Sequence, residues 1–180
     1  MKSNKTTEIL FAGFGGQGIM FMGKLLAQAG LDSKKSVTWM PSYGAEVRGG
    51  TAYSMTKISD LAIASPVVTN PDILVVMNEP SLIKYENKLK SGGILIMNKS
   101  LIGARPRRKD ITVVSISMTE LASKLGNTRC ANMVAAGAML KRSRLFSIKA
   151  ALNALKEMLG DKEDVFTLNK KAIELGYEKA

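Results

Sequence analysis

The sequence contains no histidine and only one cysteine in 180 residues. Without histidine the chain has no His-based catalytic triad, no histidine proton shuttle and none of the ligands that nearly all catalytic zinc sites use. One cysteine, Cys130, cannot form an internal disulfide, and it cannot hold an iron–sulfur cluster, which takes about four protein ligands. A cysteine nucleophile would want a histidine base, so we interpret Cys130 as a small buried thiol on a helix. We predict no catalytic residue and no metal site in this chain.

Long apolar runs are also missing. No run reaches the roughly 18 residues that cross a bilayer, and the polar segment from Met1 to Thr7 lacks the apolar centre of a signal peptide. We therefore expect a cytoplasmic protein that does not contact a membrane.

Aromatic residues make up only 6% of the chain, although its net charge is +11. A basic surface suggests an anionic partner, but the charges are scattered, and the one tight run is R-P-R-R-K at residues 105–109. A nucleic-acid-binding protein more often shows a basic stripe with interleaved stacking residues. We interpret residues 105–109 as a solvated loop and expect no nucleic-acid partner.

The residues that are present indicate one α/β domain spanning residues 1–180. Short apolar runs alternate with segments of helical periodicity. Strands are predicted at residues 7–12, 36–40, 72–77, 93–97 and 111–116, and helices at 17–30 and 79–90 and, in several pieces, from 119 onward, with boundaries near Gly126, Ser147 and Asp161. Residues 51–58 and 61–65 are expected to pair as a hairpin. The fold class is a three-layer, Rossmann-like α/β/α sandwich with a mostly parallel sheet and one antiparallel hairpin.

A glycine-rich loop follows the first predicted strand and precedes a helix. Its residues are Gly13, Phe14, Gly15, Gly16, Gln17 and Gly18, which satisfy G-x-G-x-x-G in the context that this pattern requires. A dinucleotide site would also need an acidic residue at the end of the second strand. Met40 and Pro41 stand there, and Asp32 comes before that strand, so the NAD fingerprint is incomplete. The alternatives are a turn that binds another phosphate and a turn that packs on a partner subunit.

A second polar loop follows the second strand and is the most specific stretch of the chain. It contains Tyr43, Glu46, Arg48, Gly49 and Gly50. Both loops are expected at the carboxyl end of the sheet, where open α/β sheets bind ligands and partners. Glu46 and Arg48 point the same way in an extended segment. They could pair with each other, or Arg48 could bind a phosphate or carboxylate, or the segment could be a plain exposed turn.

Together, the two loops resemble the hallmark motifs of the γ subunits of 2-oxoacid:ferredoxin oxidoreductases. The stretch from Asn132 to Ala138 resembles a later helix of that family, and the similarity runs from Glu8 to about Leu159. The 2-oxoglutarate member is the nearest, with pyruvate and branched-chain members close behind. One departure is Ala45, where related sequences often have proline.

The resemblance implies a non-catalytic subunit of a multimeric enzyme. Such enzymes decarboxylate a 2-oxoacid on thiamine diphosphate, pass electrons through iron–sulfur clusters to ferredoxin and transfer the acyl group to coenzyme A. Thiamine diphosphate and the clusters belong to the α, β and ferredoxin-like δ chains, and the γ chain contributes assembly and coenzyme A handling. The candidate cofactor-binding residues are Gly13, Gly15, Gly16, Gln17, Gly18, Tyr43, Glu46, Arg48, Gly49, Gly50 and Asn132.

The alternative to a subunit is a free-standing Rossmann-like protein that binds a nucleotide or dinucleotide. If the chain is a subunit, its isolated form exposes apolar surface, and several of its eleven methionines would lie there. We therefore expect the isolated chain to self-associate.

Overall fold

A computed structural model of the chain describes residues 6–42 and 52–180. Six strands form one sheet in this part of the chain, in the order β2-β3-β1-β4-β5-β6. The strands are β1 (Thr7–Gly13), β2 (Ser36–Pro41), β3 (Ala52–Ser59), β4 (Ile73–Val76), β5 (Ile94–Asn98) and β6 (Thr112–Ile116). The helices are α1 (Ile19–Asp32), α2 (Glu79–Tyr85), α3 (Met118–Lys124), α4 (Ala131–Ser143), α5 (Ile148–Leu159) and α6 (Glu163–Lys179), with 3-10 turns η2 (Glu86–Lys88) and η3 (Thr128–Cys130).

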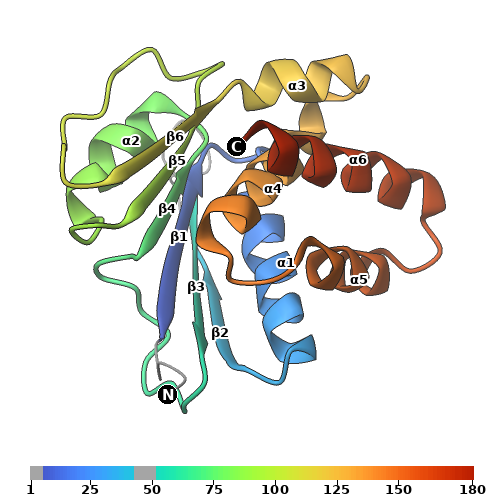
Figure 1. Cartoon of the computed structure of the whole chain (residues 1–180), viewed down its shortest axis with the longest axis horizontal. Helices are drawn as coiled ribbons and strands as arrows, with labels where there is room; N and C mark the ends of the chain where they lie inside the picture. The colour runs from blue at the N-terminus through green and yellow to red at the C-terminus, as the bar shows by residue number, and fades with distance from the viewer. Residues whose placement is uncertain (1–5, 43–51) are drawn as a thin grey trace.

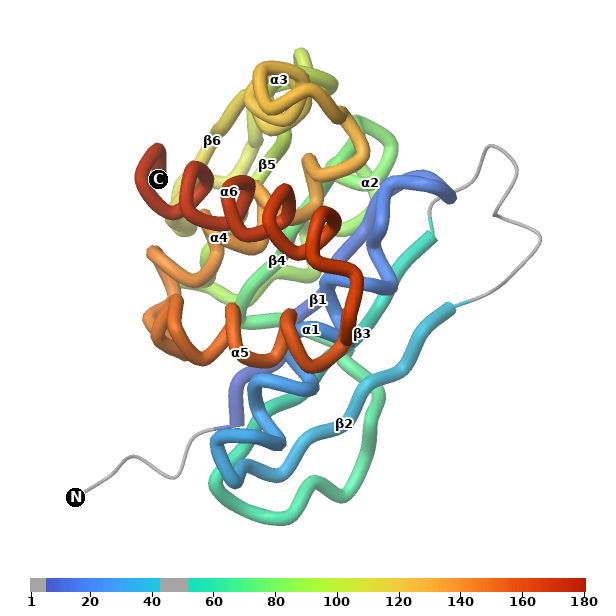
Figure 2. The backbone as a smooth tube through the Cα atoms, turned by 90° about the vertical axis from the view of Figure 1, so that its right-hand side faces the viewer, coloured from blue at the N-terminus to red at the C-terminus, as the bar shows by residue number. Residues whose placement is uncertain are grey.

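The sheet separates two hydrophobic cores, which confirms the three-layer architecture. Ile9 and Phe11 of β1 point into a core shared with α1, α4, α5 and α6, while Leu10 and Ala12 point into a smaller core beneath α2. Both faces of the central strands are thus buried, which explains their continuous apolar sequences. Figure 1 shows α2 on one side of the sheet and the other labelled helices on the opposite side. Figure 2 looks onto the outermost pair, α5 and α6.

One strand runs against the other five. β1 pairs in parallel with β4, and β4, β5 and β6 continue in parallel, whereas β3 is antiparallel to both β1 and β2. The sheet is therefore mixed, as predicted, but the antiparallel hairpin is formed by β2 and β3 and not by residues 51–58 and 61–65. The prediction of a strand at residues 61–65 was wrong, because β1 and β2 already occupy both edges of β3. Leu61, at the start of that segment, is 52% exposed.

Close packing fixes the β2–β3 hairpin on α1. Trp39 Nε1 donates a hydrogen bond of 2.9 Å to Ser54 Oγ, so one side chain from each strand joins the pair. Gly23 of α1 faces both, and a Cβ there would lie 2.2 Å from Ser54 Oγ and 2.7 Å from Trp39 Nε1. The helix can lie this close to the hairpin only because residue 23 has no side chain.

An ion-pair cluster, which we call the clasp, joins the amino ends of β1 and β4 to the carboxyl end of β3 and to the segment before β5. Glu8 lies 2.7 Å from Lys57 and 3.0 Å from Lys90, and Lys90 lies 3.1 Å from Asp72. Burial alone would raise the pKa of Glu8, but hydrogen bonds from Lys57 and Lys90 outweigh it and lower that pKa. Burial alone would lower the pKa of Lys90, and its bonds to Glu8 and Asp72 raise it. The clasp is thus stabilised in its charged form.

We expect Glu8→Gln to lower the free energy of unfolding by about 1.5–3 kcal/mol at pH 7, the usual scale for charge-assisted hydrogen bonds. Because the pKa of Glu8 is lowered on folding, its contribution is present above its unfolded pKa, about 4.3, and is lost as pH falls. The raised pKa of Lys90 makes its contribution present below about pH 10 and lost at higher pH. Urea unfolding from pH 3 to 9 should therefore show a deficit that shrinks toward pH 3.

The matched control is Glu174→Gln, whose partner Lys170 is 4.0 Å away on an exposed helix face. Such surface pairs are typically worth under about 1 kcal/mol. An E8Q deficit that stayed constant from pH 3 to 9 would show that the clasp does not act through ionised Glu8.

Candidate functional site

The glycine loop joins β1 to α1 through a tight turn, as the sequence predicts. Gln17 N donates a 3.2 Å hydrogen bond to Phe14 O, which closes a turn with Gly15 and Gly16 at its centre. Gly16 has φ +90°, the value that the third residue of a type II turn requires. A Cβ at Gly16 would have no atom within 4 Å, so the space beside this exposed backbone is open. A ligand or partner can approach the main chain there directly.

The Gln17 side chain ties this loop to the loop after β4. Its Oε1 accepts a 2.7 Å hydrogen bond from Phe14 N, and its Nε2 donates to Met77 O at 3.4 Å. The Asn78 side chain also approaches Oε1, at 3.5 Å. Gly13 makes room for this arrangement, since a Cβ there would lie 2.6 Å from Gln17 Oε1. Gln17 and Gly13 therefore shape the loop from within.

The structure brings together two predicted site residues that are far apart in sequence. Asn132, in the first turn of α4, donates from Nδ2 to Gly18 O at 3.4 Å, and its Oδ1 accepts from Met133 N at 2.9 Å. Gly18 precedes α1 with φ +70°, and the first turn of α1 has no acidic side chain. The amino ends of α1 and α4 thus meet, and the dipole of each favours negative charge at this place.

The position of Asp32 argues against a dinucleotide site. Asp32 is the last residue of α1, a helix of 14 residues, so it lies about 20 Å from the Gly18 end at 1.5 Å per residue. Its carboxylate accepts a 2.8 Å hydrogen bond from Gln28 in the last turns of the helix. The end of β2, where the acidic residue of a dinucleotide site would stand, carries Met40 and Pro41.

A crevice of about 200 Å³ opens beside the glycine loop, and we call it the edge crevice. It lies where α1 and α2 leave β1 and β4 toward opposite faces of the sheet, the kind of position at which open α/β sheets bind ligands. Its lining comes from several elements: Gly16, Gln17, Met77, Leu101, Thr119, Thr128, Arg129 and Ala131. Arg129 is exposed and supplies a cation at the rim.

Sequence reasoning did not select Arg129. The available signal was its place three residues before Asn132, at the start of a helix with family resemblance.

Most of the second predicted loop lies outside the described residues. The predicted site residues that fall there are Tyr43, Glu46, Arg48, Gly49 and Gly50. The residues that flank it are described. Ser42 N donates to Tyr53 O at 2.9 Å, and Ala52 lies opposite Gly13 in the sheet. Both flanks of the second loop are therefore at the edge where the glycine loop begins.

Cys130 is buried, as the sequence predicts, but it lies in η3, one residue before α4. Burial raises its pKa above the usual thiol value, and its Sγ lies 2.9 Å from Asn127 O, to which the thiol donates. Neutral thiols are poor nucleophiles. Across residues 6–42 and 52–180, no three acidic or thiol side chains are grouped as metal ligands would be. None of the helices in these two ranges combines the length and apolarity needed to span a membrane.

Comparison with known proteins assigns the chain to a family. The family model described as pyruvate ferredoxin/flavodoxin oxidoreductase matches residues 8–179. The chain belongs to this family. Among its relatives is ketoisovalerate oxidoreductase subunit VorA of Methanothermobacter thermautotrophicus, 34% identical over 96% of the chain. The chain spans only 36% of that relative's length.

Solved structures of the pyruvate ferredoxin/flavodoxin oxidoreductase family agree with the fold. The γ subunit of a keto/oxoacid ferredoxin oxidoreductase from Geobacter sulfurreducens is 32% identical, with a TM-score of 0.84 over 97% of this chain and 98% of that one. A 2-oxoglutarate:ferredoxin oxidoreductase from Magnetococcus marinus, with 2-oxoglutarate, coenzyme A and succinyl-CoA bound, is 25% identical, with a TM-score of 0.86. This chain covers 31% of that protein.

Proposed function

We propose that the chain is the γ subunit of a cytoplasmic, multimeric, thiamine-dependent 2-oxoacid:ferredoxin oxidoreductase. Its partners are α, β and ferredoxin-like δ chains, and the enzyme converts 2-oxoglutarate or pyruvate oxidatively to acyl-CoA. The observation that carries the proposal is the match with a solved γ subunit, which covers nearly all of this chain and nearly all of that subunit. Residues 1–180 form one γ-type domain, which self-associates when it is isolated from its partners.

The redox cofactors fit the partner chains better than this one. A cluster takes about four cysteine ligands, and this chain has one cysteine, which is buried and hydrogen-bonded. We therefore assign the iron–sulfur clusters to the partner chains, and thiamine diphosphate also to them, as the family resemblance implies. No side chain of this subunit is assigned to catalysis.

Coenzyme A fits the edge crevice through its phosphates. When bound, it supplies the thiol that accepts the acyl group. The open backbone at Gly16, the start of α1 at Gly18 and the exposed cation of Arg129 offer backbone amides and positive charge on one side of the crevice. Asn132 fixes the position of Gly18, and Gln17 fixes the turn.

The second loop completes the proposed site. Tyr43, Glu46, Arg48, Gly49 and Gly50 follow a strand that ends at this same edge. We assign Arg48 to a coenzyme A phosphate or to a carboxylate of a partner chain, and Gly13 and Gly15 to the backbone geometry of the first loop.

The test is reconstitution with purified α, β and δ chains. We expect no 2-oxoacid oxidation from this chain alone and coenzyme A-dependent turnover from the full set. In the assembled enzyme, Arg129→Ala and Arg48→Ala should each raise the KM for coenzyme A by roughly tenfold or more, because a charge-assisted hydrogen bond is worth about 1.5–3 kcal/mol. Initial rates at varied coenzyme A and saturating 2-oxoacid measure the effect.

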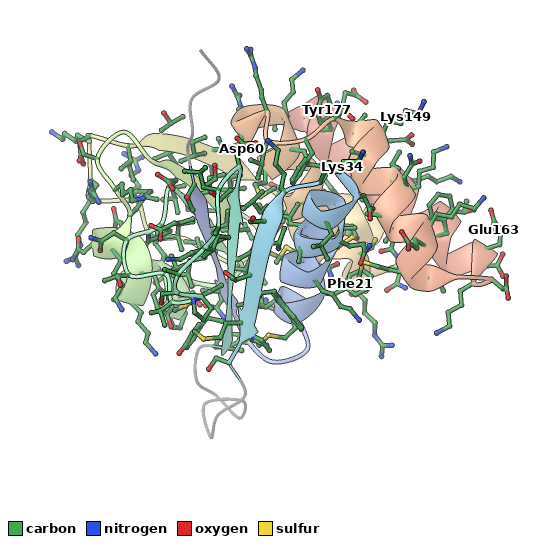
Figure 3. The ribbon with its side chains drawn as sticks, turned by 90° about the horizontal axis from the view of Figure 1, so that it is seen from below. Phe21, Lys34, Asp60, Lys149, Glu163 and Tyr177 are labelled. Carbon is green, nitrogen blue, oxygen red and sulfur yellow. The ribbon has the colours of Figure 1, made fainter. Side chains whose placement is uncertain are left out.

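The control is Lys149→Ala, at an exposed lysine of α5 (Figure 3), which should leave the KM for coenzyme A unchanged. Turnover by the purified chain alone would refute the proposed function. Unchanged kinetics in both arginine variants would remove these residues from the coenzyme A site.

A further inference from the structure

The run of basic residues after β5 lies in a loop whose backbone is anchored by hydrogen bonds to the rest of the protein. We call residues 103–109 the basic loop. It follows the carboxyl end of β5, lies beside α2 (Figure 1) and leads back to β6. This is the face of the sheet opposite α1, α4, α5 and α6. Residues 105–109 form an exposed loop, as predicted, but the protein also anchors the backbone of this loop.

Two glutamates hold the backbone of the basic loop. Glu79 Oε2 accepts hydrogen bonds from Gly103 N at 3.0 Å and Ala104 N at 3.1 Å. Glu86 Oε1 accepts from Arg107 N at 2.6 Å and Arg108 N at 2.9 Å. Glu86 is only 6% exposed, so it anchors the loop from within the protein. Both carboxylates accept hydrogen bonds from main-chain amides. Neither forms an ion pair with a basic side chain of the loop.

One of the four basic side chains turns back into the protein. Arg108 Nε donates to Asp110 Oδ1 at 2.8 Å, and Nη1 donates to Leu89 O. The hydrogen bond from Arg108 lowers the pKa of Asp110 to about 2. Arg105, Arg107 and Lys109 are exposed and form no ion pair within residues 6–42 and 52–180. Their three side chains thus extend from an anchored backbone without a direct ion-pair partner in the described residues.

A groove of about 220 Å³ separates the basic loop from α2. Its walls are Glu79, Leu82, Ile83, Glu86, Asn87, Ala104, Arg105 and Arg107. Ile83 is 66% exposed, so an apolar side chain is available to a partner beside the cations of the loop. The segment between β5 and β6 also reaches the edge crevice. Leu101, two residues before the basic loop, lines that crevice and is 47% exposed.

We propose that the surface formed by the basic loop and this groove docks a partner subunit of the same enzyme, through a segment that presents carboxylates to Arg105, Arg107 and Lys109 and an apolar side chain to Ile83. The inference rests on the proposed function and extends its interface from the edge crevice onto the α2 face. Charge complementarity selects an acidic segment, and the exposed isoleucine selects a protein over a polyanion. The basic loop contains no aromatic side chain on which nucleic-acid bases could stack.

The test uses the full chain and the purified partner chains. The triple variant Arg105→Glu/Arg107→Glu/Lys109→Glu should weaken assembly at least tenfold at about 50 mM salt, because it opposes like charges across the interface. It should also weaken the salt dependence seen with the wild-type chain. Ile83→Ser should weaken assembly at every salt concentration. Because the loop is anchored through its backbone amides, the triple variant should keep the fold, which circular dichroism checks.

The matched control is Lys149→Glu/Lys162→Glu/Lys171→Glu, three exposed lysines of α5, α6 and the turn between them. These two helices lie on the opposite face of the sheet from α2 (Figure 2). The control variant reverses the same charge and should assemble like wild type. Wild-type chain that fails to assemble would refute the proposed function. Wild-type assembly with unchanged affinity in the basic-loop variant would refute this inference alone, and so would wild-type binding to polyuridylate that outcompetes the partner chains.

Discussion

Gly137→Ala will lower the free energy of unfolding by about 2–3 kcal/mol. Gly137 of α4 faces the backbone of α6, where an added Cβ would lie 2.0 Å from Ile173 O and 2.8 Å from Tyr177 N. Gly176 of α6 faces α4 in the same way, 2.0 Å from Val134 O. A main chain packed on both sides cannot move aside as a flexible side chain can, so the helices must separate. Overpacking in a core typically costs about 1–3 kcal/mol, and clashes with backbone lie at the upper end.

The measurement is urea unfolding of Gly137→Ala, Gly176→Ala and the double variant. Because either methyl group already separates the helices, the double variant should be less destabilised than the sum of the two single variants. Gly103→Ala is the control, since its Cβ would meet only Glu79 Oε2, at 3.8 Å. Single variants within about 0.5 kcal/mol of wild type would show that α4 and α6 do not pack backbone to backbone.

Gly18→Ala will reduce coenzyme A-dependent turnover of the assembled enzyme by roughly tenfold or more and will also destabilise the chain. Gly18 has φ +70°, where an L-residue costs about 1–2 kcal/mol. Its Cβ would also lie 2.1 Å from Asn132 Nδ2 and 2.8 Å from Asn132 Cγ. The contact between the amino ends of α1 and α4 must therefore open, and positioning errors of about 1 Å at a site can cost about a hundredfold in rate.

A double-mutant cycle separates the two causes. Asn132→Ala removes the amide that the new Cβ would strike but leaves the φ of residue 18 unchanged. We expect Gly18→Ala/Asn132→Ala to regain part of the stability lost in Gly18→Ala, with a coupling energy of about 1 kcal/mol. Purely additive losses would assign the whole effect to backbone strain, and wild-type turnover in Gly18→Ala would exclude this loop from the coenzyme A site.

The sequence predicted the elements better than their pairing. Strands β1, β4 and β5 are buried on both faces, so their runs of apolar residues mark them clearly. The turn from Gly13 to Gly18 was equally readable, since it needs glycine at positive φ. The segment at residues 61–65 misled because its composition suits a strand, while pairing depends on which sheet edges are free. That is a property of the whole sheet and not of the segment.

The candidate site was predictable only in part for the same reason. Gly18 was selected from the glycine-loop pattern and Asn132 on family resemblance, but their contact spans 114 residues and follows from how α1 and α4 pack. Gln17 was selected as a cofactor ligand, whereas its side chain already bonds to Phe14 N and Met77 O. The anchoring of the basic loop by Glu86 left no sequence signal, because a carboxylate that accepts backbone amides 21 and 22 residues away has no fixed spacing.

Trp39, which is held by its hydrogen bond to Ser54, is an intrinsic fluorescent probe of the β2–β3 hairpin. Trp39 is the sole tryptophan of the chain, so tryptophan fluorescence comes from the β2–β3 hairpin alone. Trp39 lies two residues before Pro41, which ends the strand that leads to the second loop. Binding at that edge can thus be titrated without attaching a dye, and the emission of a chain assembled with Trp-free partners would still report on the hairpin.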